Sequence, residues 1–321
     1  MDIPTSSSSG IETDVEETHR HRRRRRRAYH NILRLMVELD SHEELFESLF
    51  GLSRIDFERL QSMISGDIAR NHTQFRHMNP IRSRDRLGIC LRFLTSGSSF
   101  QSLGVSYNMQ SAIIETIVLE VCDSILHYLQ SLVMPRPTKA MWKKIAAGFK
   151  GRYQMPNCIG SLNGRFVTVM GKIDHILLSL VDSDEKFVMI DLGNYGTKAS
   201  KIWDNSRMGA LFARNEFDIP EDQSPGFGTD ELPFVIVGGN SFVIKPYLIS
   251  KYRSNALADT DANKVFNCRI DPVKLTAEAA VTRLRRRWQI VQSNIPLPVP
   301  MAKRVITTAC CLENYFGSPN I

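Results

Sequence analysis

The sequence predicts an α/β protein in which a helical region precedes a mixed β-sheet with flanking helices. From Ala28 to Phe149, apolar residues recur at the three- and four-residue spacing of helices. After Pro156 they alternate with polar residues, as in strands, and helical spacing returns near the C-terminus. We therefore expect residues 1–28 as a tail, 29–150 as an all-helical region and 151–321 as the α/β domain.

The first 28 residues are polar and charged and contain no aromatic residue, so we expect them to be disordered. Such an Arg-rich tail can contact DNA phosphates, act as a nuclear import signal, or be a solvated tail without a specific partner. We expect a nuclear protein. The candidate DNA contacts of the tail are Arg22, Arg23, Arg24, Arg25, Arg26 and Arg27.

The sequence argues against a membrane protein and a zinc-binding protein. No apolar run approaches the roughly 20 residues that span a bilayer. The net charge of the chain is +7. Neither a membrane span nor a secretory signal is expected, so we expect a soluble intracellular chain. None of the six cysteines forms a C-x-x-C pair, which favours buried free thiols over a zinc site.

The helical region is expected to contain several helices. One has an apolar face over residues 32–39, and another begins after Ser53, a good N-cap residue. A third spans residues 84–94 and ends at Gly97.

A candidate helix-turn-helix follows. A short helix from Phe100, a turn near 107–109 and a longer helix over 111–129 would place Gln110 and Ser111 where a recognition helix meets base edges. The alternative is an ordinary helical hairpin, because this helix carries Glu115, Glu120 and Asp123 but no Lys or Arg.

The α/β domain has clear strand signals. Strands are expected at 165–170, 175–181, 186–192 and 233–237, with a tight polar turn at 182–185, and a last helix from 299 or 300 to 315. The run Arg283 to Trp288 is basic and ends in an aromatic residue. Arg283 and Arg286 are therefore candidate DNA contacts, or else a solvated helix face beside a buried Trp288.

Several segments have a specific combined pattern. They include RLGICLRFLTSGSSF (86–100), PNCIGSLNG (156–164), LPFVIVGGNSF (232–242), FNCR (266–269) and ACCLENY (309–315). Over about residues 45–317 the chain resembles the Harbinger-type (PIF/Harbinger) transposases and the host nuclease-like proteins derived from them. The resemblance implies an RNase H-like fold with a DDE-type metal site, preceded by a helix-turn-helix. It further implies a nuclear protein with a Myb/SANT-like partner, and phosphodiester hydrolysis by two Mg²⁺ or Mn²⁺ ions.

The metal-binding aspartates of these transposases are absent from the corresponding positions of this chain. The three positions at which the family has Asp are occupied here by Asn163, Ser200 and Gly239. At the fourth acidic position of the family this chain has Glu278, so only this position keeps its carboxylate. One carboxylate is too little charge for two divalent ions, so no metal is expected. Other acids lie nearby in sequence, namely Asp174, Asp182, Asp184, Asp191 and Asp204.

The leading hypothesis is a domesticated, catalytically inactive nuclear protein that binds DNA, a Myb-like chromatin partner, or both. The alternatives are an active metal-dependent DNA endonuclease, a protein–protein adaptor without a DNA role, and a decayed transposon copy.

Overall fold

The computed structural model describes residues 42–69, 81–196, 199–224, 226, 230–252 and 260–317. The Arg-rich tail and the helix expected at 32–39 lie outside these ranges. The chain divides into two compact units, each described below by itself. The first ends at Val121 but lacks Leu94–Gly97; the second comprises Leu94–Gly97 and the chain from Cys122 onward.

The first unit is helical, as predicted. Its described elements are α2 (Glu43–Phe50), α3 (Arg54–Ile68), most of α4 (Ser83–Ser96), α5 (Phe100–Tyr107) and the beginning of α6 (Ser111–Val133). The expected N-cap is confirmed, because the Ser53 side chain accepts a hydrogen bond from the Asp56 amide. Phe46, Phe50 and Phe57 pack together at the α2–α3 turn, and an Arg86–Glu120 ion pair joins α4 to α6.

The helices α5 and α6 are joined by residues 108–110, close to the expected turn. Asn108 allows this sharp turn by adopting a left-handed backbone with φ of 49°. Gln110 and Ser111 are exposed at the start of α6. The two helices and their turn are thus present, whereas DNA reading by them stays a prediction.

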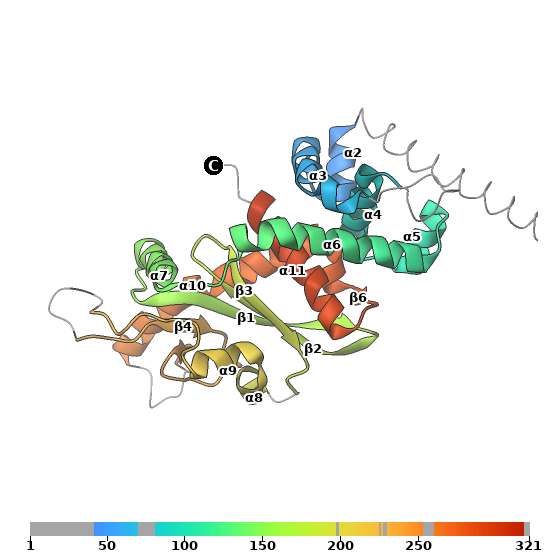
Figure 1. Cartoon of the computed structure of the whole chain (residues 1–321). Coiled ribbons are helices and arrows are strands. Elements are labelled where there is room, and N and C mark those ends of the chain that lie inside the picture. The colour runs from blue at the N-terminus through green and yellow to red at the C-terminus, as the bar shows by residue number, and fades with distance from the viewer. Residues whose placement is uncertain are drawn as a thin grey trace, which may run out of the picture. The chain divides into compact units, whose positions relative to one another are not determined.

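The second unit contains a six-stranded mixed sheet (Figure 1). The strands are β1 (Cys158–Val169), β2 (Lys172–Val181), β3 (Phe187–Gly193), β4 (Val235–Gly238), β5 (Leu248–Ile249) and β6 (Asn294–Ile295). The order is β3-β2-β1-β4-β5, with β6 also paired to β1. The β1–β2–β3 meander is antiparallel, whereas β4 and β6 run parallel to β1. This confirms the predicted α/β class and agrees with the RNase H-like fold.

Helices cover both faces of the sheet (Figure 1). They are α7 (Lys139–Tyr153), α8 (Ala199–Asn205), α9 (Arg207–Ala213), α10 (Asp261–Arg287) and α11 (Val299–Phe316). Trp203 of α8 and Phe212 of α9 pack with Leu162 on one face. On the other face, Ile270 and Val273 of α10 pack in a second cluster with Phe149, Cys158 and Val237.

Several boundaries differ from the predicted ones. The predicted helical region includes α7, but the buried Trp142 of α7 packs in the sheet core and donates a hydrogen bond to the Phe217 carbonyl (2.8 Å). The compact units accordingly divide near residue 121 rather than 150. The first strand begins at Cys158 instead of residue 165, and β5 and β6, each of two residues, were not predicted.

The cysteines agree with the expectation of free thiols, with one difference. All six are free, and five are buried, whereas Cys268 on α10 is exposed. Burial raises the pKa of Cys158 to about 12, so this thiol stays protonated and unreactive near neutral pH. Among the described residues, no helix is long and apolar enough to cross a membrane.

Asp191 on β3 is a buried carboxylate that joins three elements. Lys303 of α11 lies 2.6 Å from Asp191 Oδ1, and the Met208 amide of α9 donates to Oδ2. Burial acts to raise the pKa of Asp191, but the hydrogen bond and charge of Lys303 outweigh it and hold the pKa below its ordinary value. The charged form is therefore favoured in the folded protein.

This carboxylate should contribute to acid sensitivity. A folded-state pKa below the unfolded value gives stability that is complete above the unfolded pKa of about 3.9 and is lost as pH falls through the folded pKa. Asp191→Asn should cost about 1–2 kcal/mol at pH 7, because it removes a charge-assisted hydrogen bond to Lys303, whose side chain is 35% exposed. Between pH 5 and 2 the variant should lose less stability than the wild type.

Urea unfolding at several pH values measures both effects. Asp218→Asn is the matched control, because Asp218 is exposed and lies 3.9 Å from Lys139. Equal losses for the two variants at pH 7 would contradict the account.

Candidate functional site

The first and third expected metal positions lie side by side on the sheet. β1 and β4 pair in parallel, with Leu162 opposite Gly238. Asn163 and Gly239 each follow one residue later, on strands about 4.8 Å apart. Because β1 and β4 run in the same direction, Asn163 and Gly239 lie next to each other at one corner of the sheet.

Helix α10 brings the fourth position to the same corner. The Ser161 hydroxyl of β1 donates to the Lys274 carbonyl of α10 (3.4 Å). A Cβ atom on Gly239 would lie 3.9 Å from Lys274 Cε. Lys274 Nζ in turn lies 3.6 Å from Glu278 Oε1. We call Asn163, Gly239, Lys274 and Glu278 the β1–β4–α10 corner.

The second expected position is placed elsewhere. Ser200 lies in α8, which packs through Trp203 against Phe242 and Leu162 on the sheet face opposite α10 (Figure 1). The structure therefore groups three of the four positions on β1, β4 and α10, whereas the fourth, Ser200, belongs to α8.

The chemistry of the corner does not fit the two divalent ions that the resemblance implies. Asn163 offers a neutral amide, whose buried Oδ1 has no hydrogen-bond partner in the described part of the chain. Gly239 offers no side chain, and Glu278 already faces an ammonium group. Among the described residues, no group of three His, Cys, Asp or Glu side chains could hold a metal ion. Hard divalent cations need several anionic oxygens, so this corner lacks the required charge.

The nearby acids do not replace the missing ones. Each has another partner: Asp174 accepts from Asn194, Asp182 from the amides of its own turn, Asp184 pairs with Arg152, Asp191 with Lys303, and Asp204 with Lys245. The turn that holds Asp182 and Asp184 joins β2 to β3, as predicted. These carboxylates therefore serve local structure.

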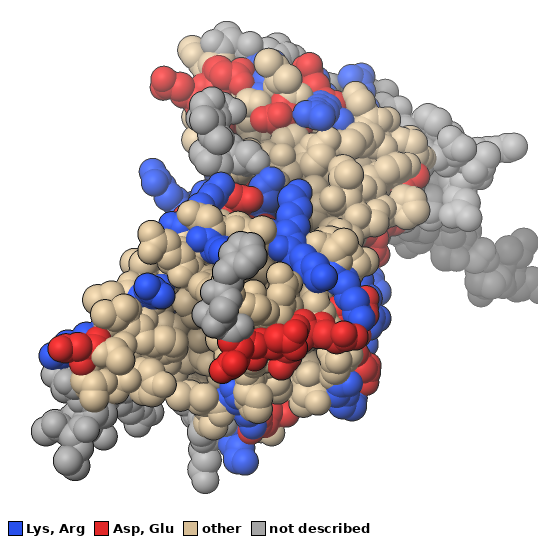
Figure 2. Space-filling view, turned by 90° about the vertical axis from the view of Figure 1, so that its left-hand side faces the viewer, with Lys and Arg blue, Asp and Glu red and all other residues tan. Residues whose placement is uncertain are grey.

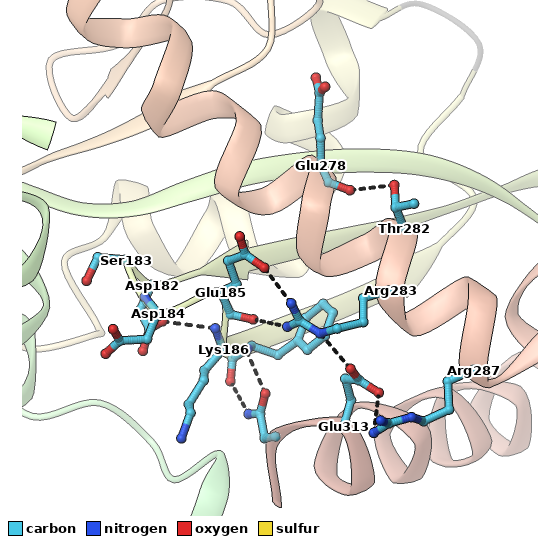
Figure 3. A network of polar contacts seen from close by, with 12 residues as sticks. Asp182, Ser183, Asp184, Glu185, Lys186, Glu278, Thr282, Arg283, Arg287 and Glu313 are labelled. Atoms are coloured by element: carbon cyan, nitrogen blue, oxygen red, sulfur yellow. Dashed lines mark hydrogen bonds and ion pairs between the residues drawn. The ribbon is translucent and has the colours of Figure 1, made fainter. Parts of the chain in front are cut away.

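Arg283, a predicted DNA contact, is held in an internal network (Figure 3). Its Nε lies 2.7 Å from Glu313 Oε1, and its Nη2 donates to the Glu185 carbonyl (3.0 Å). The Glu313 side chain is 1% exposed and also accepts from Arg287 and from the indole of Trp288, both at 3.3 Å. Arg283 thus joins α10 to α11 and to the β2–β3 turn, and Trp288 is buried, as the alternative interpretation expected.

Arg286 differs from Arg283. It lies one helical turn further along α10, is exposed, and takes part in none of the described ion pairs. In Figure 3 the Glu278 side chain points away from the Arg283 network, so the corner and the network are separate features of α10.

Lys274 was not identified from the sequence. The only signal was its position four residues before Glu278, which places both on one face of a helix. That spacing is common on surface helices and does not indicate contact with Gly239, which comes from another strand.

Comparison with known proteins agrees with the resemblance drawn from the motifs. Residues 150–314 match the family described as DDE superfamily endonuclease. A similar protein, Protein ALP1-like of Arabidopsis thaliana, is 24% identical over 294 residues, which cover 84% of this chain and 70% of the relative. No solved structure matches the chain.

The two arginines of α10 should behave differently on substitution. Arg283→Ala should destabilise the fold by about 2–3 kcal/mol, because it leaves the buried Glu313 with fewer donors. Arg286→Ala should change stability by less than about 0.5 kcal/mol, since its side chain is solvated. Urea unfolding at neutral pH measures the free energy of unfolding of both variants. A loss for Arg283→Ala as small as that for Arg286→Ala would show that the network in Figure 3 adds no stability.

Proposed function

Because the chain belongs to the DDE superfamily endonucleases, we propose that it is a transposase-derived nuclear protein that binds DNA without cutting it. One observation carries the proposal. Of the four residues that define the β1–β4–α10 corner, Glu278 alone carries a carboxylate, and this carboxylate faces the Lys274 ammonium. In the described residues β1, β4 and α10 carry three of the expected metal positions, and of these Asn163 and Gly239 offer no carboxylate.

The absence of cutting follows from charge. Two-metal hydrolysis needs ions that lower the pKa of the attacking water and stabilise the leaving oxygen. Those ions need carboxylates, and neither an amide nor a glycine supplies one. The alternative of an active endonuclease would require three carboxylates around one point, and the described residues contain no such group.

Several features support DNA as the partner. Lys and Arg side chains form a band on the face shown in Figure 2, with Asp and Glu gathered separately beside it. Arg286 of α10 and both Lys143 and Lys144 of α7 are exposed and lie outside the described ion pairs. Exposed cations of this kind bind backbone phosphates by releasing counterions, without base specificity.

Two further parts of the proposal rest on sequence. The Arg-rich tail supports nuclear localisation and an additional, non-specific contact with DNA. The Harbinger-type resemblance supports a Myb/SANT-like protein partner, which would supply sequence specificity. An adaptor function without DNA remains the second candidate, and the experiment below separates the two.

The test is fluorescence anisotropy on duplex DNA across a salt series, with the full-length chain and a chain that begins at Ala28. We expect the shortened chain to bind more weakly but with a clear salt dependence, because cations of the folded part still neutralise phosphates. Loss of all binding with the tail would instead favour the adaptor or the decayed copy.

Substitution of single arginines shows which part of the folded chain contacts the DNA phosphates. Arg286→Ala in the shortened chain should reduce the salt slope by about one, as expected for one lost phosphate contact. Arg214→Ala is the matched control, because Arg214 is exposed but pairs with Glu216 after α9, on the other side of the sheet. Equal slopes for both variants would place the DNA surface elsewhere.

A further inference from the structure

The β1–β4–α10 corner contains a cation of its own. Lys274 Nζ is 3.6 Å from Glu278 Oε1, and the Lys274 stem lies beside Gly239. We infer that Lys274 takes the place of the lost metal ions: its ammonium balances Glu278 and keeps divalent cations out of the corner. The inference rests on the proposed loss of the metal site but not on DNA binding, so either can fail alone.

Helix stability does not explain the position of Lys274. A Lys four residues before a Glu is the less favourable order for a helical ion pair. The same helix contains a pair in the favourable order, Asp261 and Lys264, also at 3.6 Å. What distinguishes Lys274 is that its Cε lies 3.9 Å from the point where a Cβ on Gly239 would be, directly after β4. The side chain of Lys264 is more exposed, 55% against 29%.

The absence of a side chain at residue 239 matters for this contact. A Cβ there would meet nothing closer than Lys274 Cε at 3.9 Å and Ser241 Oγ at 4.0 Å, which are ordinary contact distances. An aspartate would therefore fit at residue 239, and its carboxylate would lie near the Lys274 ammonium. Asn163 has the shape of an aspartate already. Two substitutions could thus restore the carboxylates without disturbing the backbone.

Lys274 should oppose the return of metal even then. A fixed ammonium repels a divalent ion, and it competes for the same carboxylate oxygens. Restoring the acids alone would mainly strengthen the internal ion pairs of Lys274. Metal binding should require both the two carboxylates and removal of the lysine charge.

The experiment measures Mn²⁺ binding by isothermal titration calorimetry on the full-length chain. The variants are N163D/G239D and N163D/G239D/K274M, with N163D/G239D/K264M as the matched control on the same helix. We expect the K274M combination to bind Mn²⁺ at least tenfold more tightly than N163D/G239D, and the K264M combination to match N163D/G239D. Circular dichroism and urea unfolding check that each variant is folded, and K274Q replaces K274M if that variant does not fold.

Three outcomes would overturn the inference. Equal Mn²⁺ affinity with and without Lys274 would show that the lysine does not exclude the ion. An equal gain from K264M would reduce the effect to net charge. A folded K274M or K274Q combination that binds Mn²⁺ no better than the wild type would show that Lys274 is not what keeps metal away.

Discussion

The buried carboxylate of Glu313 fixes the position of the helix on which the candidate site depends. It accepts hydrogen bonds from Arg283, Arg287 and Trp288, all near the end of α10, and Arg283 also contacts the β2–β3 turn at Glu185. A buried charge is tolerated only with such partners, because removing it from water is costly. The network therefore holds α10 to α11 and the meander, and with α10 it positions Lys274 and Glu278 beside β1.

The sheet and its core agree with the expected fold, whereas the expected metal-binding positions do not agree with the expected chemistry. The sheet keeps the order of an RNase H-like fold, its two faces are covered by helices, and Trp142, Trp203 and Trp288 are fully buried. The metal positions, by contrast, have lost their carboxylates. Random decay would be expected to place polar residues in the core as well. In the described residues the core is still filled with large apolar side chains, whereas three of the four expected acidic positions carry no carboxylate.

Much of the fold could be predicted because strand alternation and helical spacing are local signals. The meander from β1 to β3 and the final helix α11 were identified in this way. The two-residue strands β5 and β6 were missed, since pairs so short carry no periodic pattern and are defined only by their neighbours. Of α10, only the part around Arg283 to Trp288 is expected to be helical from the sequence. The helix begins at Asp261 and contains Pro272, a residue type that normally marks a helix end. The missing aspartates are evident from the motifs, but the approach of Lys274 to the space beside Gly239 depends on how α10 packs next to β4, which no local pattern encodes.

We expect the β1–β4–α10 corner to balance its charge internally and to hold no divalent ion. The most direct measurement is a crystal structure of the wild-type chain soaked in Mn²⁺, with anomalous scattering recorded to locate the metal. The account predicts no anomalous peak between Asn163 and Glu278, and Lys274 Nζ within ion-pair distance of the Glu278 carboxylate. A Mn²⁺ peak coordinated by Glu278, with the Lys274 side chain turned away, would contradict it.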